Sequence, residues 1–335
     1  MASPPALTRS RSSFAPPSGK LDADVFDFDH FKYPSDKLMI VALDGSDLSF
    51  RALRLASFLM CSKQVSKGAR DNVVVVNVLK PGQTENRQLM DNAVQELRKC
   101  MVLEWNVCCK SVPLPEGWTV GDALVYFANH AGFGHCNQSH LVIGAQGADG
   151  CGDMSKMGTI AVQCCAKCKV PVTVVKGAWG TVSGDRTALG RPMRTGRDGK
   201  EETGLSILVC IDGTVTGHKA FDIATAFCRE GDRLTALHVT GFLQLRTEMA
   251  DARYVIECAK VRDSRKLASC EFVKVPPGKG SSISDAIVAA SAECDLLVMG
   301  SVELANIKKR HLLGSVAMAI TKRSQCHMCV VKNFA

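Results

Sequence analysis

Residues 139–175 read SHLVIGAQGADGCGDMSKMGTIAVQCCAKCKVPVTVV, and residues 294–331 read CDLLVMGSVELANIKKRHLLGSVAMAITKRSQCHMCVV. Each stretch begins with a short apolar run that ends at a glycine, and then has a loop and a second glycine followed by Thr or Ser. An apolar-periodic helix and another apolar run complete each one. Gly144 and Gly158 are 14 positions apart, as are Gly300 and Gly314. The equal spacing predicts one unit, strand–loop–helix–strand, present twice in the chain.

The residues before the first stretch predict the rest of a parallel sheet. Residues 37–43 and 73–79 are continuous apolar runs, which are typical of strands buried on both faces. We expect helices and strands to alternate, as in a doubly wound α/β sheet. The expected strands are 37–43, 73–79, 105–112, 141–143 and 170–175, and the expected helices before the glycine loop are 49–60, 86–104 and 121–129.

The same order recurs in the second part of the chain. Its first apolar run, 206–211, ends at Asp212-Gly213-Thr214, as 37–43 ends at Asp44-Gly45-Ser46. The fold class expected is therefore α/β, with two Rossmann-like, doubly wound, five-stranded parallel sheets in tandem. The expected organisation is a disordered tail over 1–36, a domain over 37–176, a Gly- and Arg-rich linker or surface loop over 177–204, and a second domain over 205–335.

Composition narrows the class of protein. The chain has 335 residues, an apolar fraction of 46%, 16 cysteines and a net charge of +8. Its basic residues are not interleaved with stacking aromatics, so nucleic acid is not expected as a partner. No run reaches the roughly 18–20 apolar residues of a membrane span. Most cysteines lie in apolar stretches, which favours reduced thiols and a cytoplasmic protein. The acid-poor, Ser/Arg-rich start leaves organelle targeting open.

Taken together, these motifs resemble the universal stress protein family. The family pattern has a first strand ending in Asp-Gly-Ser, a Gly-Asp at the head of a later helix, and a late signature containing Met-Gly-Ser and Leu-Gly-Ser-Val-Ala. Here the matching residues are 44–46, 121–122, 299–301 and 313–317. The resemblance covers about 37–176 and 205–332. It implies that the two domains pair through their last strands, 170–175 beside 328–331, as an internal pseudo-dimer.

Nucleotide-binding members of this family carry Gly-x2-Gly-x9-Gly-Ser/Thr, whose glycine loop wraps the phosphates of ATP, with or without Mg²⁺. Glycines let the backbone approach an anion, and the amides at a helix start carry partial positive charge. The resemblance implies a nucleoside contact at Asp44 and a base pocket at Val78. The expected binding residues are Asp44, Gly45, Ser46, Val78, Gly144, Gly147, Gly158 and Thr159 in the first copy, and Asp212, Val239, Gly300, Gly314 and Ser315 in the second.

Both copies depart from the family pattern. Each has ten residues where the pattern has nine, so each loop is one residue longer. The second copy has Glu303 where the first has Gly147, and a carboxylate there repels a phosphate. Lys308, Lys309 and Arg310 follow and could offset that charge. We expect nucleotide binding mainly in the first copy. For any single residue the alternative is structural, with the aspartates capping helices and the glycines only turning the chain.

Other motifs are weaker. His130, His135, Cys136 and His140 match no standard zinc spacing. The Cys-x-x-Cys pairs at 165–168 and 326–329 do not occupy equivalent positions in the two copies. We therefore assign no metal site and no catalytic residue, and expect at most slow ATP hydrolysis.

Two functions remain open. One is a nucleotide-binding stress-response or signalling module. The other is a scaffold that does not bind nucleotide and acts through a second copy of the chain or other protein partners.

Overall fold

The structure is a computed structural model. It describes residues 20–21, 23–26, 35–60, 71–100, 102, 104–131, 136–147, 157–176, 183–186, 192–195, 201–240, 248–278, 280–301 and 313–332. Some residues named above, namely His135, Glu303 and 308–310, lie outside this described part.

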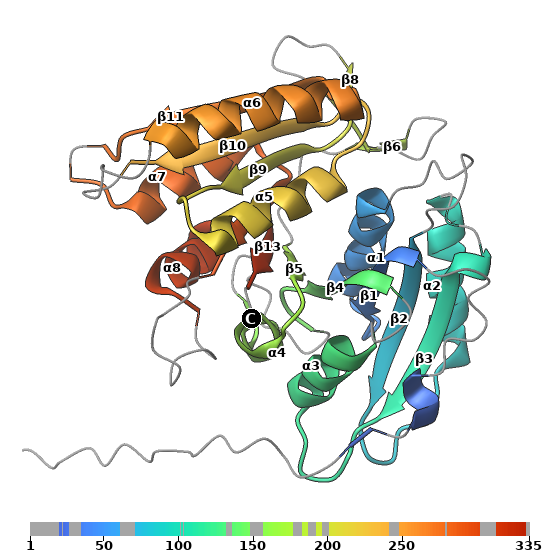
Figure 1. Ribbon diagram of the computed structural model, residues 1–335. Helices are drawn as coiled ribbons and strands as arrows, with labels where there is room; N and C mark the ends of the chain where they lie inside the picture. Colours follow the sequence, from blue (N-terminus) through green and yellow to red (C-terminus); the bar gives the residue numbers. More distant parts are fainter. Residues whose placement is uncertain are drawn as a thin grey trace, which may run out of the picture.

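The first half of the chain, residues 35–176, alternates strands and helices as the sequence predicts (Figure 1). Its elements are β1 (Ser35–Ala42), α1 (Asp47–Leu59), β2 (Asn72–Leu79), α2 (Arg87–Lys99), η2 (Glu104–Asn106), β3 (Val107–Pro113), α3 (Val120–His130), β4 (Cys136–Gly144), α4 (Thr159–Lys167) and β5 (Val172–Val175). Two boundaries differ most from the expectation. The long helix ends at Lys99 rather than 104, because Cys100 and Val102 donate back to Leu97 and close its last turn. The fourth strand begins earlier than expected, at Cys136.

The second half, residues 204–332, repeats this order. Its elements are β9 (Ser206–Cys210), α5 (Val215–Phe227), β10 (Arg233–Val239), α6 (Glu248–Arg265), β11 (Ser269–Val275), α7 (Ile283–Ala290), η4 (Ser291–Glu293), β12 (Leu296–Gly300), α8 (Ser315–Arg323) and β13 (His327–Val331).

The two halves share one sheet. Ten strands lie in the order β11-β10-β9-β12-β13-β5-β4-β1-β2-β3, and every neighbouring pair is parallel except β13 and β5. Those two strands are antiparallel, with Met328 opposite Val174 and Val330 opposite Val172. Figure 1 shows the first half (blue to green) and the second half (yellow to red) meeting at this pair. The predicted pairing of the last strands is confirmed, and the two expected five-stranded sheets are halves of one.

Two apolar layers, one on each face of the sheet, continue through both halves. One contains buried side chains of α1, α2, α5 and α6, and the other contains those of α3, α4, α7 and α8. The apolar runs explain why: Val73, Val74, Val75 and Val76 of β2 are all buried and alternate between the two layers. Both apolar layers therefore continue across the junction of the halves, although polar side chains, among them Thr173 and Lys176, are also buried there.

Each half contributes one buried lysine whose ammonium donates hydrogen bonds to the other half. Lys176, just after β5, donates from Nζ to the carbonyl oxygens of Thr321 (2.7 Å) and Ser324 (2.5 Å) at the end of α8. Lys332, just after β13, donates to the carbonyl of Ala166 near the end of α4. A cation at a helix C-terminus satisfies carbonyls that have no partner within the helix. Burial lowers the pKa of both lysines to about 8. Each half thus caps the last helix of the other.

Two expectations about irregular segments need correction. The tail over 1–36 was expected to be disordered, but η1 (Ala23–Phe26) packs on the first half. Leu21 and Val25 are buried there, and the Phe26 ring stacks on Phe127 at 5.3 Å. The segment 177–204 was expected to be a linker or loop, but it contains a separate three-stranded antiparallel sheet of β6 (Ser183–Arg186), β7 (Pro192–Thr195) and β8 (Glu201–Thr203).

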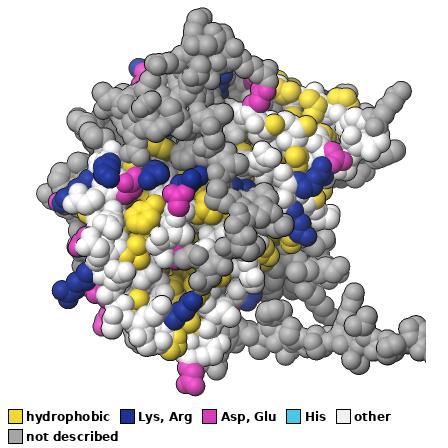
Figure 2. Space-filling model, turned by 180° about the vertical axis from the view of Figure 1, so that it is seen from behind, with side chains coloured by type: hydrophobic (Ala, Val, Ile, Leu, Met, Phe, Trp, Pro, Cys, Tyr) yellow, Lys and Arg dark blue, Asp and Glu magenta, His cyan; other side chains and the backbone are white. Residues whose placement is uncertain are grey.

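On the face drawn in Figure 2, Lys and Arg side chains lie interspersed with Asp and Glu side chains. Within the described part of the chain, no helix combines the length and the apolar character needed to cross a bilayer.

Candidate functional site

The first predicted motif, Asp44-Gly45-Ser46, forms a tight turn between β1 and α1. Asp44 Oδ1 accepts hydrogen bonds from the Ser46 backbone amide (2.9 Å) and from Ser46 Oγ (2.6 Å). Gly45 has φ of 88°, which side-chain-bearing residues rarely adopt. Ser46 Oγ also accepts from the Ser49 amide and so caps α1. The turn leaves the Asp44 carboxylate exposed at the carboxyl end of β1.

The second motif brings the glycines of β4 against this turn. A Cβ on Gly144 would lie 3.0 Å from Leu48 Cβ, so only glycine lets β4 end so close to α1. A Cβ on Gly147 would lie 2.8 Å from Asp44 Oδ2. Asp44 and Gly147 are 103 positions apart in the sequence and are neighbours here. The structure therefore brings together two residues that the sequence assigned to one site.

The third motif begins α4. Gly158 is its N-cap, with φ of −70° and ψ of 162°, and no side chain caps this helix. The Gly158 amide instead donates to Ala145 O at 2.7 Å, which fixes the helix start beside the Gly144–Gly147 segment. The first-turn amides of such a helix point outward and attract an anion. Thr159, the first helical residue, is exposed at this end.

The other helices of the first half begin differently. Ser46, Asn86 and Thr119 cap α1, α2 and α3 with side-chain oxygens that accept from backbone amides. An oxygen in that position occupies the place an anion would take. In the first half, the helix predicted to face phosphates is therefore the one described helix that lacks such a cap.

Val78 lies at the end of β2, as predicted, and is half-buried against the layer of α3 and α4. The residue before it, Asn77, donates from Nδ2 to Leu43 O at 2.7 Å and ties the end of β2 to the end of β1. Val78 therefore lies near the carboxyl end of β2, the strand that pairs with β1, and Asp44 follows the carboxyl end of β1.

The second half has the same turn at Asp212-Gly213-Thr214, but the Asp212 carboxylate has different neighbours from that of Asp44. Asp212 Oδ1 accepts from the Thr214 amide (3.0 Å) and Thr214 Oγ1 (2.7 Å), and Gly213 has φ of 76°. A Cβ on Gly217 would lie 2.4 Å from Asp212 Oδ1, so this carboxylate lies against the start of α5. In the first half the corresponding position holds Ser49. The two aspartates thus have the same turn and different neighbours.

The remaining predicted residues of the second half are at the expected elements. Gly300 ends β12, and a Cβ on it would lie 3.0 Å from Thr216 Cγ2. Gly314 begins α8 with no side-chain cap, and Ser315 is its first helical residue. Val239 ends β10 and is half-buried. Since Glu303 lies outside the described residues, its distance to Gly314 stays open.

The second half also contains polar groups that sequence reasoning did not assign. His238 Nδ1 is 3.0 Å from Asp251 Oδ1, and Lys274 Nζ donates to Asp251 Oδ2 at 2.7 Å. Burial raises the pKa of Asp251, but hydrogen bonds from Lys274 and His238 outweigh it and the net pKa is lowered. The sequence signal was the position of His238, which matches Asn77 of the first half. Asp251 and Lys274 come from other elements, so spacing could not reveal them.

A tyrosine lies near the Asp212 turn. Tyr254 Oη is 3.4 Å from His218 Nδ1. Burial raises the pKa of Tyr254 to about 12, and the Asp212 carboxylate adds to the increase. The hydroxyl therefore stays protonated at neutral pH and can donate a hydrogen bond.

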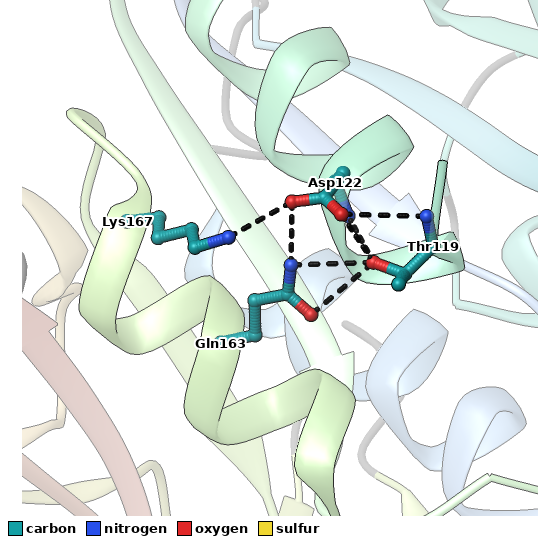
Figure 3. A network of polar contacts seen from close by, with 4 residues as sticks. All are labelled: Thr119, Asp122, Gln163 and Lys167. Carbon is teal, nitrogen blue, oxygen red and sulfur yellow. Dashed lines mark hydrogen bonds and ion pairs between the residues drawn. The ribbon is translucent and has the colours of Figure 1, made fainter. Parts of the chain in front are cut away.

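The Gly121-Asp122 motif is a structural tie between α3 and α4 (Figure 3). Asp122 accepts from Thr119 Oγ1 (2.6 Å), Gln163 Nε2 (2.6 Å) and Lys167 Nζ (2.9 Å). A Cβ on Gly121 would lie 2.3 Å from Gln163 Oε1, so glycine makes room for the glutamine. Burial raises the pKa of Asp122, but the bonds from Thr119 and Lys167 outweigh it and the net pKa is lowered. The motif thus holds α4, the helix begun by Gly158, in place.

Replacing Asp122 with alanine is expected to lower the free energy of unfolding by about 1–2 kcal/mol, because α3 loses its capping box and Lys167 loses its partner. Urea denaturation of the full chain measures the change. Asp263→Ala, which removes an exposed carboxylate beside Arg262, is the matched control and should leave the curve unchanged. Equal curves for all three proteins would contradict a structural role for Asp122.

The cysteine motifs are buried. Cys165 and Cys168 are each 1% exposed, and Cys329 is fully buried in β13. Burial raises the pKa of the Cys165 thiol, and it raises the pKa of Cys329 to about 12. His140 is buried in β4. No group of three or more His, Cys, Asp or Glu side chains in the described part of the chain could hold a metal ion.

Comparison with known proteins shows similarity to the universal stress protein family and to its α/β fold. Residues 205–332 match the model of the universal stress protein family. A search of curated proteins found no match. Among solved structures, a protein of unknown function from Pseudomonas aeruginosa PAO1 is 12% identical with a TM-score of 0.54, and the match covers 91% of this chain and 95% of that one. A candidate universal stress protein from P. aeruginosa UCBPP-PA14 is 12% identical with a TM-score of 0.52, covering 89% and 93%.

A universal stress protein solved in complex with cAMP also matches, at 16% identity and a TM-score of 0.31, over 42% of this chain and 96% of that one. The two longer matches show that the fold extends over nearly the whole chain. The fold is that of a tandem, doubly wound α/β protein. Residues 205–332 are similar to the universal stress protein family, and the first half repeats the same fold.

Proposed function

We propose that the chain binds a nucleotide, ATP with Mg²⁺, at the first-half site formed by Asp44, Gly147 and the start of α4. The observation that supports this most directly is the geometry at Gly158. An uncapped helix begins beside a glycine segment that itself lies against the Asp44 turn. Exposed amides at a helix start bind phosphate oxygens, and glycines let those oxygens come close.

Each residue has a place in this proposal. The amides of Gly158, Thr159 and the following turn bind phosphate oxygens, and Thr159 Oγ1 supplies a further donor. Asp44 faces the nucleoside, and Val78 packs on the base from the neighbouring strand. Mg²⁺ accompanies ATP as its counter-ion. This site lies at the carboxyl ends of β1 and β4, the usual ligand position in an open parallel sheet.

The protein acts, in this proposal, as a binding module of stress response or signalling and not as an enzyme. Asp44 Oδ1 already accepts two hydrogen bonds from Ser46, and we assign no general base at this site. The His238–Asp251 pair lies in the other half, on β10 and α6. At most, slow hydrolysis of bound ATP accompanies binding.

A second candidate is a scaffold that binds no nucleotide and acts through protein partners. It is favoured by the loop between Gly147 and Gly158, which is one residue longer than the family pattern, and by Glu303 in the second copy. A longer loop moves the glycines relative to the helix start and weakens a phosphate cradle. The two candidates differ in one measurable property, nucleotide affinity.

Gly147→Glu is expected to weaken ATP binding by on the order of 100-fold, because it introduces a negative charge beside the phosphates. Gly147 is exposed and has no positive φ, and a Cβ there requires only that the tip of the Asp44 side chain, 2.8 Å away, shift. The matched control is Gly278→Glu, the same change at an exposed glycine of the second half, which should retain affinity. Isothermal titration with ATP and Mg²⁺ measures all three proteins, with circular dichroism as a check of folding.

Two results would contradict the proposal. Unchanged affinity in Gly147→Glu would place the nucleotide elsewhere. A wild-type chain that copurifies with no nucleotide and shows no binding at millimolar ATP would favour the scaffold.

A further inference from the structure

The second half has a network of three polar side chains at the carboxyl edge of its sheet. His238 is the last but one residue of β10, Lys274 is the last but one residue of β11, and Asp251 lies in the first turn of α6. The strand register places His238 directly opposite Lys274, so the two side chains share one face of the sheet. Asp251 joins them, because Oδ1 lies 3.0 Å from His238 Nδ1 and Oδ2 accepts from Lys274 Nζ at 2.7 Å.

This network determines which ring nitrogen of His238 carries the proton. Burial raises the pKa of Asp251, but hydrogen bonds from Lys274 and His238 outweigh it, so the carboxylate is ionised at neutral pH. An ionised carboxylate only accepts hydrogen bonds, so Nδ1 of His238 is the donor. In the neutral imidazole, Nε2 therefore carries the lone pair.

The Nε2 atom of His238 is not used by the fold. The side chain of His238 is 9% exposed, and that of Lys274 is 40% exposed. Nε2 has no hydrogen-bond partner among the described residues. It is also not one of their fully buried nitrogens without a partner, as both ring nitrogens of His140 are. The lone pair is therefore free to react with a small molecule that reaches this edge of the sheet.

The first half has the same strands without this network. Asn77 and Ser111 occupy the positions of His238 and Lys274, and they are opposite each other in the same register. Asn77 donates to Leu43 O at 2.7 Å, and Ser111 Oγ donates to Glu85 Oε1 at 3.0 Å. The fold therefore does not require an imidazole or an ammonium at these positions, and their presence in the second half points to chemistry.

The arrangement suits a nucleophile that reacts with an anionic group. A carboxylate that accepts from Nδ1 holds the ring in one orientation and stabilises the positive charge that develops when Nε2 attacks. The Lys274 ammonium, on the neighbouring strand, attracts a negatively charged group toward that nitrogen. A phosphoryl group is anionic, and it forms a covalent bond with an imidazole nitrogen.

We propose that His238 accepts a phosphoryl group on Nε2 from a small phosphoryl donor, with Asp251 orienting the ring and Lys274 attracting the phosphoryl oxygens. The Nε2 lone pair attacks phosphorus and a nitrogen–phosphorus bond forms, while the bond from phosphorus to the leaving group breaks. When phosphoramidate is the donor, ammonia leaves with the bonding electrons. Attack of water on the product releases phosphate and returns the free imidazole. This modification does not depend on nucleotide binding in the first half.

Phosphoramidate, which transfers its phosphoryl group without an enzyme, is the probe. The folded full chain is incubated with it at neutral pH and is kept out of acid afterwards, because acid hydrolyses the nitrogen–phosphorus bond. Trypsin releases His238 in the peptide 234–246 and His218 in 201–219, each with a single histidine. We expect tandem mass spectrometry to find the phosphoryl group on 234–246 before any other histidine peptide. Phosphorus NMR of the folded chain should show the Nε2 and not the Nδ1 product.

Two variants test the roles of the side chains. His238→Asn should lose the label on 234–246, and its fold should be intact, because Asn77 occupies the same position in the first half. Asp251→Asn should slow labelling of His238 several-fold, because the amide stabilises the charged ring less. The matched control is Asp222→Asn, which changes an exposed carboxylate 4.0 Å from His218 Nε2 and should keep the wild-type rate. Circular dichroism checks the fold of each variant.

Four results would each overturn the proposal. One is labelling of 201–219 or another histidine peptide before 234–246, and another is a chain that takes up no phosphoryl group on 234–246. The third is a product phosphorylated on Nδ1. The fourth is a labelling rate in Asp251→Asn equal to that of the wild type, which would show that the carboxylate only supports the fold.

Discussion

Replacing Lys37 with methionine is expected to lower the free energy of unfolding by about 3–5 kcal/mol. The Lys37 ammonium is buried, lies 3.2 Å from Asp71 Oδ2, and donates to Leu59 O (3.1 Å) in the first half and Ala226 O (2.9 Å) in the second. Methionine fills the same volume but leaves the buried Asp71 carboxylate without this cation and two helix-end carbonyls without this donor. The loss is large because both halves contribute to one buried charge.

Urea denaturation of the full chain measures this loss. The matched control is Lys99→Met, which removes an exposed ammonium at 3.4 Å from Glu96 and should cost far less, because Glu96 keeps its bond from Arg54. The double variant Lys37→Met with Asp71→Leu should be more stable than the sum of the single changes predicts by more than about 1 kcal/mol. Additive changes, or a small effect of Lys37→Met alone, would show that the buried Lys37–Asp71 pair contributes little to stability.

Acid should destabilise the chain between pH 6.5 and pH 4, before most carboxylates titrate. Burial, with a smaller contribution from Lys37, lowers the pKa of His140 to about 3. Burial, with Arg51 and Lys176 nearby, lowers the pKa of His327 to about 3 as well. In this pH range the unfolded chain binds a proton at each histidine and the folded chain does not. Stability therefore falls as pH falls, by up to about 1.4 kcal/mol per pH unit for each histidine.

His140→Leu isolates half of this effect. Neither ring nitrogen of His140 has a hydrogen-bond partner among the described residues, and the ring lies 5.1 Å from the Phe227 ring. Leucine should therefore raise stability at pH 5 and halve the slope of unfolding free energy against pH. The control His130→Leu, at an exposed position, should leave the slope unchanged. A slope in His140→Leu equal to that of the wild type would contradict the assignment.

The element order could be predicted from the sequence because its signals are local. Apolar runs such as 73–79 are strands, and the repeated spacing of Gly144 with Gly158 and Gly300 with Gly314 predicted two equal units. The pairing of their last strands was implied by the family resemblance. The lysine contacts between the halves could not be predicted. In the sequence, Lys176 and Lys332 are only polar residues that follow a strand. Their carbonyl acceptors belong to the other half and lie near them only because the two halves pack together. Phe26 similarly packs through a contact with Phe127 that no local pattern indicates.

The candidate site was predictable in part for the same reason. The Asp-Gly-Ser turn and the glycine-led helix are local motifs, and the structure places Gly147 beside Asp44 as the motif requires. The hydrogen bonds of Asp122 with Gln163 and Lys167 depend on how α3 and α4 pack. The sequence therefore identified the Gly121-Asp122 motif but could not predict that it joins these two helices. Asp251 and Tyr254 contact side chains of other elements, and no sequence spacing reveals these contacts.

The central claim is that two copies of one fold have become unequal, with the first able to bind a nucleotide. The stoichiometry of ATP binding tests it most directly. Isothermal titration of the purified, nucleotide-free full chain with ATP and Mg²⁺ should give one site per chain, whose affinity falls on the order of 100-fold in Gly147→Glu. Two sites per chain would show that the second copy also binds, and a chain that binds no ATP would show that neither copy does.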